Sequence, residues 1–256
     1  MIAERGGIAL AALVALGAAA VCGGSARAAG DCWLQDERTL RLVGATDDAM
    51  RTCVEAAATA DVDRLVVTSA GGDALTAMEI GDLLVRPALH VVVDHECNSS
   101  CANYFLPLAS RITLRPGSMV LLHGGMDPGF VKQGVAQEPL LTANLEMRVA
   151  HQDDFAERHG VPLGWLLYRE DYADRAFGAH LEGEAAWSAP SARMVLVEEA
   201  LLRSCLSQAR IDPLEDTLAQ RAGRDALLRN RLVRMGVAAS GSLRCVGNDA
   251  GEASSG

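Results

Sequence analysis

The chain has 256 residues and a formal net charge of −10 at pH 7, and 50% of its residues are hydrophobic. Non-specific binding to nucleic acid or to anionic lipid needs a basic face, so this acidic balance argues against both, and we expect no nucleic-acid partner. The length fits one domain with a helical C-terminal region.

Residues 1–28 have the features of an export signal. Arg5 supplies a positive charge, an apolar stretch follows from about residue 8 to residue 21, and Ala26-Arg27-Ala28 matches a cleavage pattern. The apolar stretch is too short for a stable membrane anchor. We therefore expect a soluble mature protein that begins at Ala29 and is periplasmic or secreted.

Six cysteines remain after the one at position 22 leaves with the signal. An even number in an exported chain indicates disulfides. Pairing each cysteine with its sequence neighbour gives three expected bonds: Cys32–Cys53, Cys97–Cys101 and Cys205–Cys245. The alternative is a metal site, but no His/Cys group has a recognisable zinc spacing, so we expect no metal.

The first predicted strand and helix lie on either side of a glycine pair. Residues 64–68 are apolar and β-branched, which is typical of a buried strand, and Ser69-Ala70-Gly71-Gly72 ends the run. Apolar residues then recur at helical spacing over residues 74–85, with Asp73 placed to cap the helix start. Pro87 ends this helix.

A second strand, predicted over residues 89–93, leads into the stretch "HECNSSCANYF", which begins at His95. Two adjacent serines, Ser99 and Ser100, lie there between two cysteines. The segments after the serines are expected to be a helix and two short strands: 101–108, 112–114 and 119–122. Strands that alternate with helices predict an α/β fold with a parallel sheet covered by helices.

Helices are predicted for most of the remaining chain. Apolar residues recur on one face of a long helix over 138–158, and further helical runs cover about 190–210 and about 213–236. The predicted domain spans residues 29–238. The small, polar tail over 239–256 is expected to be partly disordered, with Cys245 tying down its first part.

Three chemically suggestive features follow three predicted strands. Gly71 and Gly72 follow the first, Ser99 and Ser100 the second, and His123 the last. In open α/β sheets, sites form at the carboxyl ends of strands. A serine nucleophile needs an imidazole or another base, and backbone N–H groups to stabilise the oxyanion. These residue types and their order predict a serine-hydrolase site.

The same stretches resemble Clp-type serine peptidases and their exported relatives, within the Clp/crotonase fold. The resemblance covers residues 62–125 and rests on "TSAGGDALTAMEIGDLL", "CNSSCANYF" and "ITLRPGSMVLLHGG". Arg111, Pro116 and His123 match the tail of the family pattern. Exported members often carry Cys-x-Ser-Ala-Cys around the serine, where this chain has Cys-Asn-Ser-Ser-Cys.

The resemblance implies a role for each matched residue. Gly72, next to Gly71, would supply one oxyanion N–H, the residue after the nucleophile would supply the other, and His123 would be the general base. The cysteine frame makes Ser99 the nucleophile, whereas counting back from Ala109 points to Ser100. We narrowly prefer Ser99.

The family also places an acid well after the histidine. Asp171 and Asp174 in "YREDYADRAF" are the nearest candidates, with Glu182 and Glu184 behind them, and none lies in a recognisable motif. A missing acid would equally fit a relative that kept the fold and lost the activity.

Three functions follow from these observations. The first is a serine hydrolase acting on a peptide or protein substrate, without a cofactor and as a possible homo-oligomer. The second is an inactive envelope binding or scaffolding module, in which Ser99 and Ser100 only cap a helix. The third is a crotonase-like acyl-thioester enzyme, which export disfavours because coenzyme A is a cytoplasmic cofactor.

Overall fold

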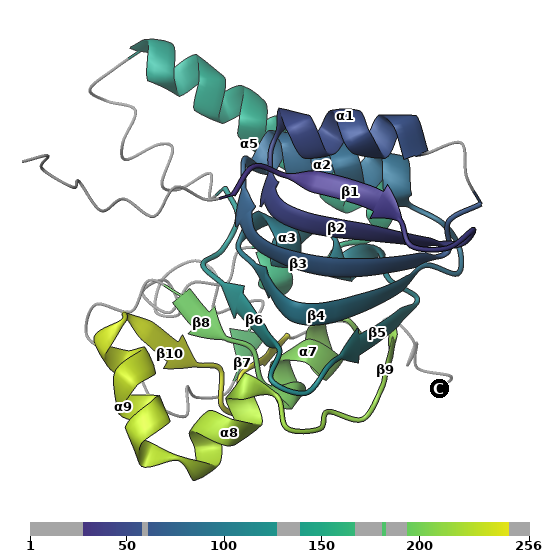
Figure 1. Cartoon of the computed structure of the whole chain (residues 1–256). Coiled ribbons are helices and arrows are strands. Elements are labelled where there is room, and N and C mark those ends of the chain that lie inside the picture. Colours follow the sequence, from purple (N-terminus) through teal and green to yellow (C-terminus); the bar gives the residue numbers. More distant parts are fainter. Residues whose placement is uncertain (1–27, 58–60, 127–138, 167–180, 183–193, 246–256) are drawn as a thin grey trace, which may run out of the picture.

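The structure is a computed structural model that describes residues 28–57, 61–126, 139–166, 181–182 and 194–245 (Figure 1). The expected signal segment falls outside these ranges except for residue 28. In the part of the chain that is described, no helix is long and apolar enough to cross a membrane.

A sheet of nine strands forms the centre of the described chain. Its strands are β1 (Asp31–Leu34), β2 (Thr39–Thr46), β3 (Arg64–Gly72), β4 (His90–Asn98), β5 (Arg111–Leu114), β6 (Met119–Leu122), β8 (Met194–Leu196), β9 (Arg210–Ile211) and β10 (Val237–Ala239). Their order is β1-β2-β3-β4-β6-β8-β10, and β5 branches from β4 and pairs with β9. A separate two-stranded sheet joins β7 (Leu181–Glu182) to β11 (Arg244–Cys245).

Most strand pairs of the large sheet are parallel. β2, β3 and β4 run parallel to one another, and β4 runs parallel to both β5 and β6. The pairs β1–β2 and β6–β8 are antiparallel. The runs Leu65–Val67 and Val91–Val93 are fully apolar and buried, as expected for strands in the middle of a parallel sheet. The mixed α/β class with a mostly parallel sheet, predicted from the sequence, is thus confirmed.

Helices cover the sheet and alternate with short strands in the C-terminal region. They are α1 (Asp48–Ala57), α2 (Ala74–Leu84), α3 (Ser100–Tyr104), α5 (Pro139–His159), α6 (Leu163–Leu166), α7 (Glu199–Cys205), α8 (Leu218–Arg224) and α9 (Ala226–Arg234), with a 3-10 turn over Leu106–Leu108. In Figure 1, α1 and α2 lie along one side of the strands β1–β4, and α8 and α9 lie at the opposite end of the molecule, next to β10.

The predicted helix after the glycine pair is present, and its cap is the expected one. The Asp73 side chain accepts a hydrogen bond from Thr76 N at the start of α2. Gly81 on this helix allows close packing, because a Cβ there would lie 3.1 Å from the ring of Phe155. Since Phe155 belongs to α5, the small glycine brings α2 and α5 together.

Two strands are longer than predicted, and the C-terminal helices were predicted incorrectly. β3 continues to Gly72 and β4 to Asn98. Of the predicted helix over 190–210, the described residues, which begin at 194, are helical only in α7, and Met194–Leu196 instead pairs with β6 and β10 as a strand. The predicted helix over 213–236 is divided at Asp225, whose side chain accepts from two N–H groups and starts a new helix.

Three disulfides join sequence neighbours: Cys32–Cys53, Cys97–Cys101 and Cys205–Cys245. The last bond ties α7 to β11, so the stretch just before residue 246 is paired within the fold.

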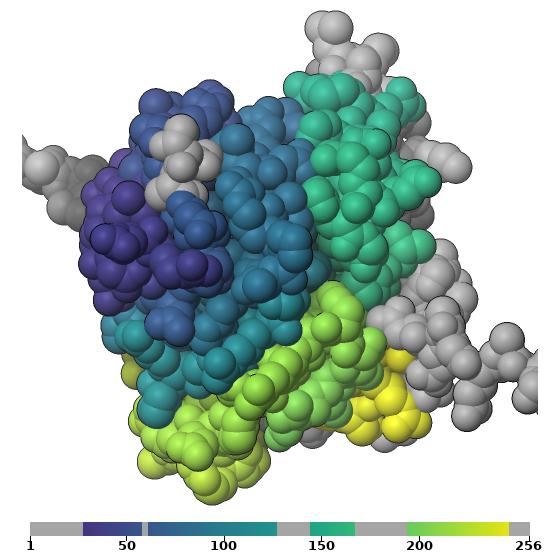
Figure 2. Space-filling model, turned by 90° about the vertical axis from the view of Figure 1, so that its right-hand side faces the viewer, coloured from purple at the N-terminus to yellow at the C-terminus, as the bar shows by residue number. Residues whose placement is uncertain are grey.

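Figure 2 shows the green C-terminal residues lying against the teal part of the chain, where β9 pairs with β5.

Candidate active site

Ser99 lies between the end of β4 and the start of α3, in a strained conformation. Its φ of 55° and ψ of −127° are unusual for a residue with a side chain. Such strain persists only where the surrounding structure holds it, and it concentrates at functional sites. Although Ser99 is at the N-cap position, its side chain makes no capping hydrogen bond. The helix-cap interpretation of this hydroxyl is therefore wrong.

The hydroxyl of Ser99 meets the imidazole of His123. Ser99 Oγ lies 2.5 Å from His123 Nε2. The two residues come together because β4 and β6 are parallel neighbours, so their carboxyl ends lie at the same edge of the sheet. The Ser99 N–H donates to Leu121 O at 2.8 Å, and the Leu121 N–H donates to Asn98 Oδ1 at 3.0 Å. These bonds fix Ser99 relative to β6, the strand that directly precedes His123.

Ser100 points elsewhere. Its Oγ accepts from Gly72 N at 2.7 Å and lies 2.7 Å from Thr46 Oγ1, and the residue is only 3% exposed. The hydroxyl therefore links β2, β3 and the start of α3. Of the two candidate serines, the structure brings Ser99 and not Ser100 to His123.

The two glycines provide space and polar contacts beside the serines. Gly71 has a φ of 83°, and a Cβ there would lie 2.6 Å from Ser99 Cβ and 3.0 Å from Ser100 N. A larger residue at this position would collide with the start of α3.

The backbone N–H groups near Ser99 differ in whether they already donate a hydrogen bond within the protein. The Gly71 N–H donates to Ser69 Oγ at 3.1 Å and the Gly72 N–H donates to Ser100 Oγ, so the donor expected from Gly72 is engaged within the protein. Among the described residues, no group accepts the Ser100 N–H. That N–H belongs to the residue after Ser99, which is the second donor that the resemblance implies.

The Cys97–Cys101 disulfide encloses both serines. Cys97 belongs to β4 and Cys101 to α3, and their Cα atoms are 5.2 Å apart. Both cysteines are fully buried. The bond thus spans the strand-to-helix turn and restrains the strained backbone of Ser99.

The predicted acids belong to residues whose side chains the structure does not describe. Asp171, Asp174 and Glu184 lie outside the described residues, and for Glu182 the structure describes only its backbone in β7. The resemblance did not indicate Thr46 or Asn98. Asn98, which accepts from the Leu121 N–H, could have been found in the sequence only by its position directly before the serines.

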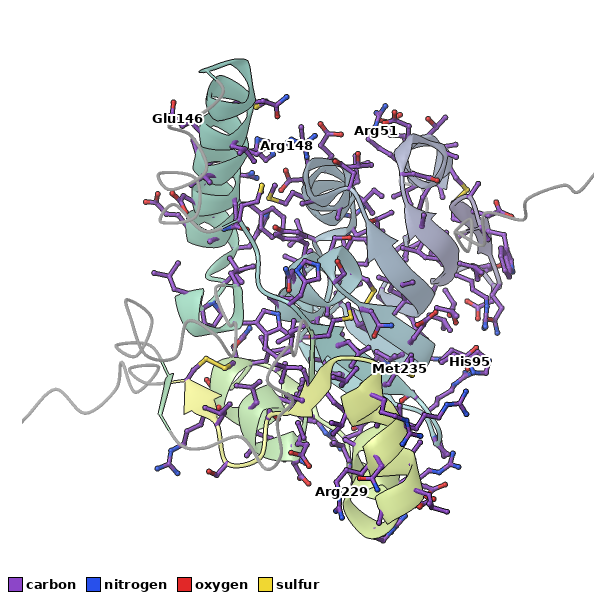
Figure 3. The ribbon with its side chains drawn as sticks, turned by 90° about the vertical axis from the view of Figure 1, so that its left-hand side faces the viewer. Arg51, His95, Glu146, Arg148, Arg229 and Met235 are labelled. Atoms are coloured by element: carbon purple, nitrogen blue, oxygen red, sulfur yellow. A yellow bond between two sulfur atoms is a disulfide. The ribbon has the colours of Figure 1, made fainter. Side chains whose placement is uncertain are left out.

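Charged residues surround the helix that follows the glycine pair. Arg148 reaches from α5 toward α2 and lies 2.8 Å from Asp73 Oδ2 (Figure 3). Burial alone would raise the pKa of the Asp73 carboxyl, but the Thr76 N–H and the Arg148 guanidinium outweigh it and hold the pKa below its usual range. Asp73 is therefore ionised at neutral pH and stabilises the start of α2.

No protein-family model and no curated protein matches the chain. Among solved structures, it is similar to an enoyl-CoA hydratase from Bacillus anthracis, with 8% identity over 37% of this chain and 50% of that one and a TM-score of 0.29. A protein from Acinetobacter baumannii described as an enoyl-CoA hydratase/isomerase gives 12% identity, 51% and 70% coverage and a TM-score of 0.28. An enoyl-CoA hydratase from a Polaromonas species gives 11% identity, 36% and 50% coverage and a TM-score of 0.27.

The aligned part of the chain spans half the length of two of these proteins and 70% of the third. At this level of similarity their activities cannot be transferred to the chain. The function proposed below therefore rests on the side chains at the end of β4 and β6.

Proposed function

We propose that the chain is an exported serine hydrolase that acts on peptide or protein substrates, with Ser99 as nucleophile and His123 as general base. The observation that carries the proposal is the 2.5 Å contact between Ser99 Oγ and His123 Nε2, made by a serine with a strained backbone and no capping bond. A serine hydroxyl is a poor nucleophile until a base takes its proton, and this geometry supplies the base.

The reaction follows from this pair. Ser99 Oγ attacks the carbonyl carbon of the substrate while His123 Nε2 takes the hydroxyl proton. The tetrahedral intermediate collapses as the C–N bond breaks, and the imidazolium gives its proton to the leaving amine. Water then repeats the sequence on the acyl-enzyme, with His123 again as base, and releases the acid and free Ser99.

The oxyanion of the intermediate needs N–H donors near the nucleophile. The Ser100 N–H is the best candidate, because no described group accepts from it and Gly71 leaves the space beside it free of a side chain. The Gly72 N–H becomes available only if the Ser100 hydroxyl turns away from it. Asp171 and Asp174 remain the candidates for the acid that orients His123.

Export is part of the proposal. Three disulfides are typical of oxidising compartments outside the cytoplasm, and the sequence begins with a segment that has the features of a signal. An exported protein would not meet coenzyme A, which is the reason for preferring a hydrolase over an acyl-thioester enzyme.

The test is covalent labelling of the purified, disulfide-intact protein with a fluorophosphonate probe, followed by peptide mapping. We expect a single phosphonylated residue, Ser99, and loss of activity on unfolded protein substrates after labelling. Absence of labelling at millimolar probe and of any peptide cleavage would overturn the hydrolase and support the scaffolding alternative.

A further inference from the structure

The segment just after His123 is held by contacts from distant helices. Gly125 N donates to Leu166 O, and a Cβ at Gly125 would lie only 2.2 Å from Gln152 Oε1. The backbone of this segment therefore passes directly against the Gln152 amide. Since β6 ends at Leu122, these contacts help to hold the chain just after His123.

Gln152 is a polar residue placed in the interior of the protein. It lies on α5 and is 1% exposed. Its Nε2 donates to Met126 O at 2.9 Å, and its Oε1 accepts from Met126 N at 2.8 Å. One side-chain amide thus pairs with both backbone groups of Met126, in the way that a neighbouring strand would.

The same amide also contacts the helix that begins after Ser99. Tyr104, in the last turn of α3, donates its hydroxyl to Gln152 Oε1 at 2.8 Å. Tyr104 is fully buried, and burial raises the pKa of its phenol, so the hydroxyl stays protonated and acts as the donor. Gln152 therefore connects the helix that follows Ser99 with the segment that follows His123 through side-chain hydrogen bonds.

We propose that Gln152 is a positioning residue that fixes His123 relative to Ser99 by clamping Met126 and Tyr104. The inference rests on the proposed hydrolase function. Reaction rates in enzymes are sensitive to misplacement by about 1 Å, which can lower them about 10²-fold. One buried hydrogen bond, from Tyr104, and two partly buried ones, to Met126, supply the rigidity that such a position requires.

Two substitutions test the clamp. Gln152→Met fills a similar volume without hydrogen bonds, and Gln152→Glu keeps the acceptor but donates to Met126 O only when its carboxyl is protonated. Gln220→Met is the matched control, because Gln220 also makes side-chain bonds to backbone, with Leu214 O and in the capping box of α8, away from His123.

For Gln152→Met we expect the maximal rate of fluorophosphonate labelling to fall about 10–10²-fold with an unchanged half-saturating probe concentration. For Gln152→Glu we expect the labelling rate, divided by that of the wild type, to decrease as the pH rises and the new carboxyl ionises. Gln220→Met should label like the wild type. The positioning role of Gln152 would be overturned if the ratio of Gln152→Glu to wild-type labelling rates did not change with pH and Gln152→Met labelled as fast as Gln220→Met.

A second readout separates this proposal from the hydrolase itself. The imidazole signals of His123 in an NMR spectrum, assigned by their loss in His123→Ala, report its environment without any reaction. We expect them to shift in the Gln152 variants and to stay in place in Gln220→Met. If the wild-type protein does not label, the proposed hydrolase function is wrong, but the NMR shift of His123 still tests the role of Gln152. If the His123 signals do not shift in a folded Gln152→Glu protein, the role of Gln152 is wrong whatever the outcome for the hydrolase.

Discussion

Two disulfide-closed regions of the molecule differ in what their bonds hold. Cys97–Cys101 joins residues four apart, where β4 turns into α3 around Ser99, whereas Cys205–Cys245 joins residues forty apart and ties α7 to β11. In the chain-entropy account, closing the short loop contributes about 2 kcal/mol to stability and closing the long loop about 4 kcal/mol.

The difference shows that the short bond is poorly suited to stabilise the fold and well suited to hold a local geometry. It encloses the strained Ser99 and starts at the strand that pairs with the histidine's strand. The long bond encloses β9, α8, α9 and β10, and no residue of the Ser99–His123 pair. Activity and stability should therefore respond separately to changes in the two regions.

The largest effect is expected at His123. Removing the base from a working serine hydrolase lowers its rate by a factor on the order of 10⁶, so His123→Ala should lose almost all fluorophosphonate labelling and remain folded. His95→Ala is the control, because His95 is exposed at the periphery of the molecule (Figure 3). Equal labelling rates for the two variants would exclude His123 as the base.

The two disulfides should give opposite results when each is replaced by an alanine pair. Cys97→Ala with Cys101→Ala should lower the labelling rate about 10-fold or more, because Ser99 leaves its strained position, and lower the free energy of unfolding by only about 2 kcal/mol. Cys205→Ala with Cys245→Ala should lower the free energy of unfolding by about 4 kcal/mol and leave the labelling rate of the folded protein unchanged. Urea denaturation and labelling at low temperature measure both.

A smaller effect on stability alone is expected at Asp94. This carboxylate, on β4, bonds to Arg41 on β2, across the intervening strand β3, and lies 2.5 Å from Arg115 Nη1. Burial alone would raise the pKa of Asp94, but the hydrogen bonds from Arg41 and Arg115 outweigh it and hold the pKa below the usual 3.8. Asp94→Asn should lower stability by about 2 kcal/mol at neutral pH.

The pH dependence of the Asp94 effect follows from the direction of that shift. Because the folded state holds the proton less tightly than the unfolded state, the stabilisation is complete above pH 3.8 and is lost as the pH falls below it. The melting temperatures of wild type and Asp94→Asn should therefore converge in acid. A difference that stays constant down to pH 2 would contradict this account.

The smallest effect is expected at Glu198, which precedes α7 and accepts a hydrogen bond from the Gly241 N–H in the region closed by the long disulfide. Burial raises the pKa of its carboxyl above 4.5, and the Gly241 N–H only partly offsets this. The folded state holds this proton more tightly, so stability falls as the pH rises through the raised pKa. Glu198→Gln has no carboxyl to ionise and so does not lose this stability. Its melting temperature relative to that of the wild type should therefore rise slightly between pH 4 and pH 8. A relative loss over this range would contradict the assignment.

Much of the candidate site could be predicted because its residues follow short, strongly apolar strands. The order of Gly72, Ser99 and His123 at successive strand ends requires only that neighbouring parallel strands end at one edge. The order of the strand ends does not show whether Ser99 or Ser100 is the nucleophile. Ser100 is held by Thr46, 54 residues earlier in the chain, and no local pattern shows that contact.

The remaining differences also come from long-range contacts. Met194–Leu196 was predicted to be helical, but it pairs with two strands that are distant in sequence, and such pairing overrides local preference. Gln152 had no signal, because a glutamine on a charged helix is usually exposed. Its burial follows from Met126 and Tyr104, which only the folded chain brings to it.

The most direct test of the central claim compares fluorophosphonate labelling of Ser99→Ala and Ser100→Ala, with melting temperatures measured on the same samples. Ser99 Oγ contacts His123, so Ser99→Ala should lose labelling and melt close to the wild type. Ser100 Oγ bonds to Gly72 N and Thr46, so Ser100→Ala should keep most labelling and lose about 1 kcal/mol of stability. Labelling that survives in Ser99→Ala and disappears in a folded Ser100→Ala would contradict the assignment of the nucleophile.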